Sequence, residues 1–176
     1  MSTIQKAKHL IEAIPKTARV IELAGPTPGG NAFLKAHKIR LAAKPLITNR
    51  EDPVLFYGLP PYPRKLAVNE IANIHNLTYR DVDMFLCSYL TWFNERHHSS
   101  RALFRRWVAT LHYKLRYINS HSNPRISLFR ETARALKPNG LLLVEGVRED
   151  DFAIAKKCGF RIVCKDDNYA VLFQLP

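Results

Sequence analysis

The sequence predicts a three-layer α/β domain with a mostly parallel sheet that closes with a C-terminal antiparallel hairpin. Three observations predict this fold: strand-length apolar segments alternate with helical patterns, the segment 83–88 is apolar on both faces, and two β-like runs end the chain. Strands apolar on both faces lie inside sheets covered by helices, and alternating strands and helices form parallel sheets. No repeat or low-complexity tract divides the 176 residues, so we expect a single domain over 1–176.

The first half of the chain alternates helix and strand. In order, the predicted elements are a helix over 4–14, a strand over 18–24, a helix over 31–37 and a strand over 44–48. Pro15 ends the first helix, and Asn31 can cap the second. Between them, the run Gly25-Pro-Thr-Pro-Gly-Gly30 predicts a tight loop directly after the first strand.

The second half continues the alternation and ends in two strands. The predicted elements are a strand over 83–88, helical segments over 90–117, a helix over 126–136, a strand over 141–145, a helix over 152–157 and strands over 160–165 and 169–175. Lys137-Pro-Asn-Gly140 predicts the turn that ends one helix before the next strand. Residues 66–75 fit neither pattern clearly.

Composition excludes several classes of protein and indicates the kind of partner. Three cysteines without CxxC spacing support neither a disulfide framework nor a cysteine zinc site, and we expect no metal. No apolar run approaches the roughly 20 residues of a membrane span, and no secretory signal begins the chain, so we expect a cytoplasmic location. The net charge of +12 favours an anionic partner.

The order of these segments, together with Arg19-Val-Ile-Glu-Leu-Ala-Gly-Pro-Thr-Pro-Gly-Gly30, resembles the class I S-adenosylmethionine-dependent methyltransferases. This Rossmann-like family has an acidic residue and a glycine-rich turn after its first strand, and the resemblance covers about residues 16–176. It implies that Glu22 faces the amino-acid part of S-adenosylmethionine and that the following turn contacts the cofactor through Ala24, Gly25, Thr27, Gly29 and Gly30. Ala24 and Pro26 stand where glycines are usual, so a purely structural turn is the alternative.

Three further segments carry the resemblance around the cofactor. After the second strand the family places a carboxylate on the ribose; here either Asn49 makes neutral contacts or Glu51 reaches back, unless this is a solvated loop. Near the adenine the resemblance implies Asn69 or Glu70, with a solvated helix end as the alternative. The segment 81–93 resembles the fourth strand and its loop, which places Cys87 and Ser88 at the carboxyl edge of the sheet. The segment 133–145 resembles the turn and fifth strand of the family.

Residues 95–130 form a predicted basic helical insert beside the expected active site. They hold eight basic residues and one acidic residue, interleaved with aromatic and histidine side chains. Such a segment can contact phosphates and stack bases, although an amphipathic helix with a basic outer face is the alternative. The residues that we expect on the substrate side are Tyr89, Trp92, Arg101, Arg105 and Arg106.

The resemblance therefore implies an S-adenosylmethionine-dependent methyltransferase that acts on RNA or on an anionic small molecule. Methyl transfer depends chiefly on alignment, so a nucleophilic substrate needs no dedicated base and the sequence names no catalytic residue. The altered turn and the missing ribose carboxylate support an alternative, a catalytically inactive methyltransferase-fold module that binds nucleic acid or a protein partner.

Overall fold

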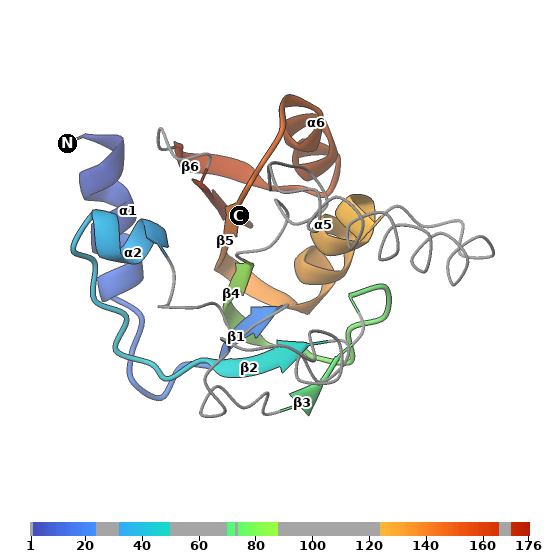
Figure 1. Ribbon diagram of the computed structural model, residues 1–176, viewed down its shortest axis with the longest axis horizontal. Coiled ribbons are helices and arrows are strands. Elements are labelled where there is room, and N and C mark those ends of the chain that lie inside the picture. The colour runs from blue at the N-terminus through green and yellow to red at the C-terminus, as the bar shows by residue number, and fades with distance from the viewer. Residues whose placement is uncertain (1, 24–31, 50–69, 73, 88–123, 166–169) are drawn as a thin grey trace, which may run out of the picture.

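The computed structural model describes residues 2–23, 32–49, 70–72, 74–87, 124–165 and 170–176. In this part of the chain seven strands form one sheet in the order β3-β2-β1-β4-β5-β7-β6 (Figure 1). The strands are β1 (Val20–Leu23), β2 (Leu46–Asn49), β3 (Glu70–Ile71), β4 (Val82–Cys87), β5 (Leu136–Glu145), β6 (Arg161–Lys165) and β7 (Ala170–Gln174).

Strand direction confirms the predicted mostly parallel sheet with a reversed hairpin at its end. The pairs from β3 through β5 are parallel, whereas β7 runs antiparallel to both β5 and β6. Because β6 is antiparallel to β7, it points the same way as β5. Strand β7 is therefore the reversed strand of the described sheet. The terminal hairpin therefore inserts its second strand next to β5 and leaves its first strand at the edge.

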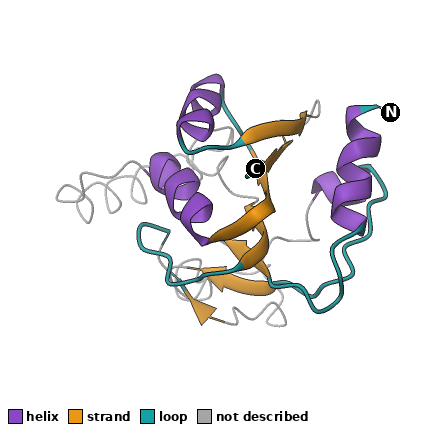
Figure 2. Cartoon of the chain, turned by 180° about the vertical axis from the view of Figure 1, so that it is seen from behind, coloured by secondary structure: helices purple, strands orange, loops and turns teal. Residues whose placement is uncertain are grey.

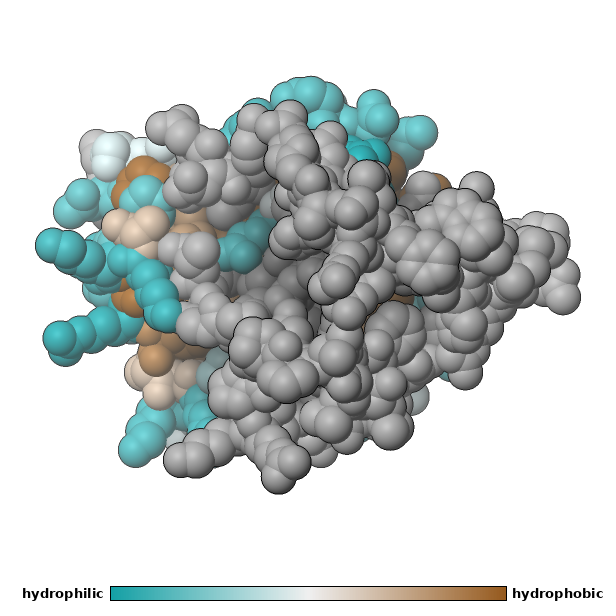
Figure 3. All heavy atoms as spheres, in the orientation of Figure 1, coloured by the Kyte–Doolittle hydropathy of each residue, from teal (hydrophilic) through white to brown (hydrophobic). Residues whose placement is uncertain are grey.

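Helices cover both faces of the sheet and confirm the three-layer prediction. Helices α1 (Thr3–Glu12) and α2 (Ala32–Ala36) lie on one face, and α5 (Pro124–Ala135) and α6 (Glu149–Lys157) lie on the other, as the two opposite views show (Figures 1 and 2). Around α1 and α2 the described surface is mostly hydrophilic, with apolar side chains visible between the polar ones (Figure 3).

The helix α1 follows from its apolar spacing and from its cap. Ser2 accepts a hydrogen bond from the Gln5 backbone N–H at 3.2 Å, which satisfies one of the amides that a helix start leaves open. Ala7 and Ile11, four residues apart, are fully buried on the face toward the sheet. Farther along, Glu12 accepts a hydrogen bond from the Arg40 N–H at 3.1 Å and ties α1 to the chain after α2.

Alternate strand residues supply a separate core for each face. The core under α1 and α2 contains Val20, Met84, Leu86, Leu141, Leu143 and Phe33. The core under α5 and α6 contains Ile21, Phe85, Leu142, Phe129, Phe160 and Phe173. In the second core the Phe173 ring meets the rings of Phe129 and Phe160 edge-on at centroid distances of 5.3 and 6.0 Å. Both faces of the central strands are therefore buried, as the apolar segment around 83–88 predicts.

Strand β5 begins earlier than the sequence predicts. The turn expected at 137–140 forms a bulge inside the strand: Val82 pairs with Leu136, and two residues later Met84 pairs with Leu141. Asn139 takes a positive φ of 64°, and a Cβ on Gly140 would lie 2.8 Å from the Lys137 carbonyl oxygen. The turn chemistry was predicted correctly, but pairing of Leu136 with β4 extends the strand around it.

Candidate functional site

The carboxyl ends of three neighbouring strands carry predicted cofactor residues. Glu22 lies near the end of β1, Asn49 is the last residue of β2, and Cys87 is the last residue of β4. From β1 the chain continues to β2 and β3 on one side, and β4 and β5 lie on the other, so the strand order reverses between β1 and β4. Open α/β sheets bind ligands outside the carboxyl ends of the strands at such a reversal.

Glu22 is held firmly in the centre of this edge. It pairs with Ile47 of β2 and with Leu86 of β4, and its residue is 9% exposed. Its backbone carbonyl accepts a hydrogen bond from the Thr48 hydroxyl at 2.9 Å, and Thr48 is itself buried. This hydrogen bond thus reinforces the pairing of β1 with β2 where β1 ends. The backbone that carries the Glu22 side chain is therefore held in place.

Glu70 and Cys87 occupy different surroundings from Glu22. Cys87 is buried between Leu23 and Val144, and all three residues belong to the core under α5 and α6. Glu70 is exposed at the start of β3, where it pairs with Thr48. Burial, and after it the negative charge of the Glu70 carboxylate, raises the pKa of Tyr79 to about 12. Glu70 therefore lies on β3, two strands from β1, and its carboxylate is close to Tyr79, which comes just before β4 in the chain.

The other predicted residues lie outside the described residues. For the cofactor these are Ala24, Gly25, Thr27, Gly29, Gly30, Glu51, Asn69 and Ser88; for the substrate they are Tyr89, Trp92, Arg101, Arg105 and Arg106. Of the expected basic insert over 95–130, residues 124–130 belong to α5, in which Leu128 and Phe129 are fully buried. Two basic residues of that range have partners, since Arg125 contacts Asp151 and Arg130 contacts Glu131.

Glu145 is a residue at this edge that the sequence reasoning missed. It is the last residue of β5, and its Oε1 accepts a hydrogen bond from the backbone N–H of Phe33 at 3.3 Å. Phe33 is the second residue of α2, so a side chain from β5 reaches the helix that follows β1. The available signal was a carboxylate at the end of an apolar strand, which is the same pattern that singled out Glu22.

An ion pair fixes the two helices that begin near the end of β5. Arg125 in the first turn of α5 contacts Asp151 in the first turn of α6 through two nitrogens, and its Nε lies 2.7 Å from Asp151 Oδ1. Arg125 also donates to the Gly146 carbonyl at 3.1 Å, and Asp151 accepts from the Arg148 N–H at 2.7 Å. The Asp151 side chain is 1% exposed. Helix α6 begins at Glu149, earlier than the predicted start at 152, and its acidic first turn was the sequence signal for that start.

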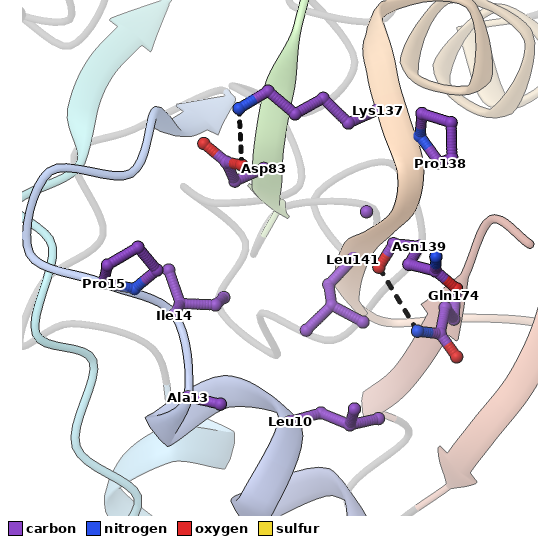
Figure 4. Close-up of a pocket in the computed structure, with 11 residues that line it drawn as sticks. Leu10, Ala13, Ile14, Pro15, Asp83, Lys137, Pro138, Asn139, Leu141 and Gln174 are labelled. Carbon is purple, nitrogen blue, oxygen red and sulfur yellow. Dashed lines mark hydrogen bonds and ion pairs between the residues drawn. The ribbon is translucent and has the colours of Figure 1, made fainter.

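A cavity of about 240 Å³ lies at the opposite, amino edge of the sheet (Figure 4). Leu10, Ile14 and Leu141 give it an apolar side, and Asp83 and Lys137 form an ion pair at 2.8 Å on its rim. Partial burial alone would raise the pKa of Asp83, but hydrogen bonds from Lys137 and from the Arg19 N–H outweigh it and lower that pKa. These groups satisfy one another, so the cavity is a structural feature apart from the predicted cofactor edge.

No group of three His, Cys, Asp or Glu side chains in the described ranges could hold a metal ion. Within the same ranges no helix has the length and apolar character that a membrane crossing requires.

Comparison with known proteins identifies the fold. No protein-family model matches the sequence, and no curated protein matches it. A TehB-like S-adenosylmethionine-dependent methyltransferase from Corynebacterium glutamicum is similar in structure with a TM-score of 0.52 and 12% identity, over 95% of this chain and 85% of that chain. A second S-adenosylmethionine-dependent methyltransferase, from Clostridium acetobutylicum, gives 0.52 and 12% over 98% and 89%. The chain therefore has the class I methyltransferase fold, as the sequence resemblance implied.

Proposed function

We propose that the chain is an S-adenosylmethionine-dependent methyltransferase, that residues 1–176 work as one domain, and that the cofactor binds at the carboxyl ends of β1, β2 and β4. The observation that carries this proposal is the position of Glu22. Its carboxylate belongs to a residue that is 9% exposed and lies on β1 beside the reversal of strand order. A nearly buried carboxylate at that point suits a ligand with a cationic amino group.

The residues at this edge fit S-adenosylmethionine, which supplies an electrophilic methyl group when it is bound. The Glu22 carboxylate accepts from the amino group of the ligand, and Asn49 or Glu51 accepts from the ribose hydroxyls. Cys87, at the end of β4, is buried in the core under α5 and α6. These residues orient the donor against the acceptor, and alignment of this kind can supply about 7–11 kcal/mol of the barrier reduction.

For the acceptor we propose RNA, with an anionic small molecule as the alternative. Support comes from the net charge of +12 and from the basic, aromatic composition of 95–130. In this proposal Arg101, Arg105 and Arg106 contact phosphates while Tyr89 and Trp92 pack against the acceptor group. We place this activity in the cytoplasm.

The second candidate function is an inactive module with the same fold. Ala24, Pro26 and Asn49 favour it, because proline lacks an amide donor and asparagine lacks the charge of the usual ribose ligand. In that case the basic segment alone carries the function, and it holds nucleic acid or a protein partner.

Thermal unfolding of cofactor-stripped protein separates the two functions. At about 100 times its dissociation constant, S-adenosylmethionine or S-adenosylhomocysteine should stabilise the protein by about 2.7 kcal/mol, which is roughly 5–10 °C at this chain length. Glu22→Gln should remove most of that shift. The control is Glu149→Gln, because the Glu149 side chain is 86% exposed on α6 and should leave the shift unchanged. No shift at millimolar ligand contradicts the enzyme and favours the module.

Salt dependence tests the acceptor separately. If the basic segment binds RNA, the logarithm of affinity should fall linearly with the logarithm of salt concentration. A variant with Arg101, Arg105 and Arg106 changed to Gln should flatten that slope by about two units at roughly 0.7 per single-strand contact. The matched control changes three exposed lysines, Lys6, Lys156 and Lys157, to Gln and should leave the slope nearly unchanged. Equal effects in both variants contradict a specific RNA surface.

A further inference from the structure

Glu145 and Glu22 lie on the same face of the sheet. Glu22 pairs with Leu86, and Leu86 pairs with Leu143, so these three residues share one level and one face. Because side chains alternate along a strand, Glu145 points to the same face as Leu143 two residues before it. Leu86 and Leu143 belong to the core under α1 and α2, so both carboxylates belong to the α2 side.

The hydrogen bond from Phe33 holds the Glu145 carboxylate at the start of α2. At about 4.8 Å per strand and 3.3 Å per residue, the Cα atoms of Glu22 and Glu145 are roughly 12 Å apart. The bond of 3.3 Å from the Phe33 N–H to Glu145 Oε1 places the carboxylate at the start of α2, the helix that follows β1. The carboxylate therefore lies at the carboxyl end of β5, on the same face of the sheet as Glu22.

We propose that Glu145 is a second carboxylate of the cofactor site and that it makes the site favour the cationic methyl donor over its neutral product. This inference rests on the proposed function. In the transfer, the acceptor's electron pair forms the new bond to the methyl carbon, and the pair of the broken C–S bond stays on sulfur. The sulfonium thereby becomes a neutral thioether, the methylated acceptor takes the positive charge and gives it up as a proton to water, and the amino and carboxylate groups of the ligand keep their charges.

The size of the preference follows from Coulomb's law. One charge about 6 Å from a carboxylate, at an effective dielectric constant of about 40, corresponds to roughly tenfold in affinity. Such a difference in affinity would help the product to leave. The attraction that causes it acts on the sulfonium charge, which the donor has and the product lacks. A residue that only caps α2 would change the affinities for donor and product by the same factor. The ratio of the two dissociation constants therefore distinguishes a charge role from a structural one.

Calorimetric titration of S-adenosylmethionine and S-adenosylhomocysteine into wild type, Glu145→Gln and Glu145→Asp tests this proposal. Glutamine keeps an oxygen that can accept from the Phe33 N–H but removes the charge. We expect it to weaken the donor about tenfold and the product less than threefold, whereas Glu145→Asp keeps the wild-type ratio. Glu149→Gln, on the exposed start of α6, is the control and should change neither constant.

Several outcomes would overturn the proposal, and they differ from failure of the proposed function. Equal weakening of both ligands by Glu145→Gln reduces the residue to a structural cap, and no change removes it from the site. If wild type binds neither ligand, the cofactor site itself fails, and this inference fails with it. If Glu145→Gln does not fold, the salt dependence of binding to the wild-type protein is the test. The affinity for S-adenosylmethionine should fall more steeply with salt concentration than the affinity for S-adenosylhomocysteine, and equal slopes for the two ligands overturn the proposal.

Discussion

Removing the charge of Asp151 should destabilise the protein more than any comparable change at the surface. Asp151→Asn keeps an oxygen that can accept from the Arg148 N–H at the start of α6. It breaks the two-nitrogen contact with Arg125 and leaves in place the hydrogen bond from Arg125 to the Gly146 carbonyl at 3.1 Å. The Arg125 side chain is 15% exposed, so water replaces the lost carboxylate poorly.

The expected magnitude follows from the burial of this pair. Breaking one partner of a buried ion pair costs about 3–5 kcal/mol, and the remaining exposure of Arg125 favours the lower end, about 3 kcal/mol. For a chain of this length that corresponds to a fall of roughly 6–12 °C in Tm. A domain of ordinary stability, about 5–15 kcal/mol, would remain folded at room temperature.

Urea unfolding of wild type, Asp151→Asn and a double variant Arg125→Met, Asp151→Leu measures this effect. We expect the double variant to recover much of the loss, because apolar residues leave no charge buried. Glu149→Gln is the surface control: its pair with Lys165 at 3.3 Å is exposed on both sides and should contribute less than about 1 kcal/mol. A loss below about 1 kcal/mol for Asp151→Asn would refute the argument and show that Arg125 is solvated.

Three smaller perturbations test other parts of the fold. Gly140→Ala should cost about 1–3 kcal/mol in urea unfolding, because its Cβ would lie 2.8 Å from a backbone oxygen; an unchanged midpoint would contradict the close approach. Phe173→Ala should cost about 3–5 kcal/mol by loss of a fully buried ring, and a loss under 1 kcal/mol would show that the site collapses around it. The pKa of Asp83 is lowered in the folded state, so its carboxylate stabilises the fold above about pH 4, and this contribution disappears as pH falls through the lowered pKa. Asp83→Asn should therefore lower Tm at pH 7, and the Tm values of variant and wild type should converge in acid. A difference in Tm that stays constant with pH would contradict this linkage.

Local patterns were enough to predict most elements of this fold. The spacing of Ala7 and Ile11 on α1 reflects burial against one neighbouring layer, and the apolar run of β4 reflects burial on both faces; a sequence records both patterns directly. The bulge at 137–140 was beyond such reasoning, because it arises when Leu136 pairs with Val82 far away in the chain. Turn residues predict a local bend, but the neighbouring strand decides whether that bend ends the strand or lies inside it.

The candidate site was predictable where a residue ends its own strand and unpredictable where a contact joins distant elements. Glu22 could be named because the segment from Arg19 to Gly30 resembles the family motif of an acidic residue before a glycine-rich turn. The bond from Phe33 to Glu145 spans 112 residues of sequence, and Arg125 meets Asp151 across 26. Neither spacing has a local signature, since each contact joins elements that only the complete fold brings together.

The altered glycine turn does not by itself decide between an enzyme and an inactive module. Pro26 removes one amide donor, but the described chain is fixed on both sides of the turn. Before it, the Glu22 carbonyl is held by the Thr48 hydroxyl, and after it, the Phe33 amide is held by Glu145. Chain ends that are already ordered leave less conformational entropy to lose when a ligand binds, which offsets part of the lost hydrogen bond. We therefore expect cofactor affinity to depend on Glu22 and Glu145 as well as on the turn, and these are the residues at which it should be measured.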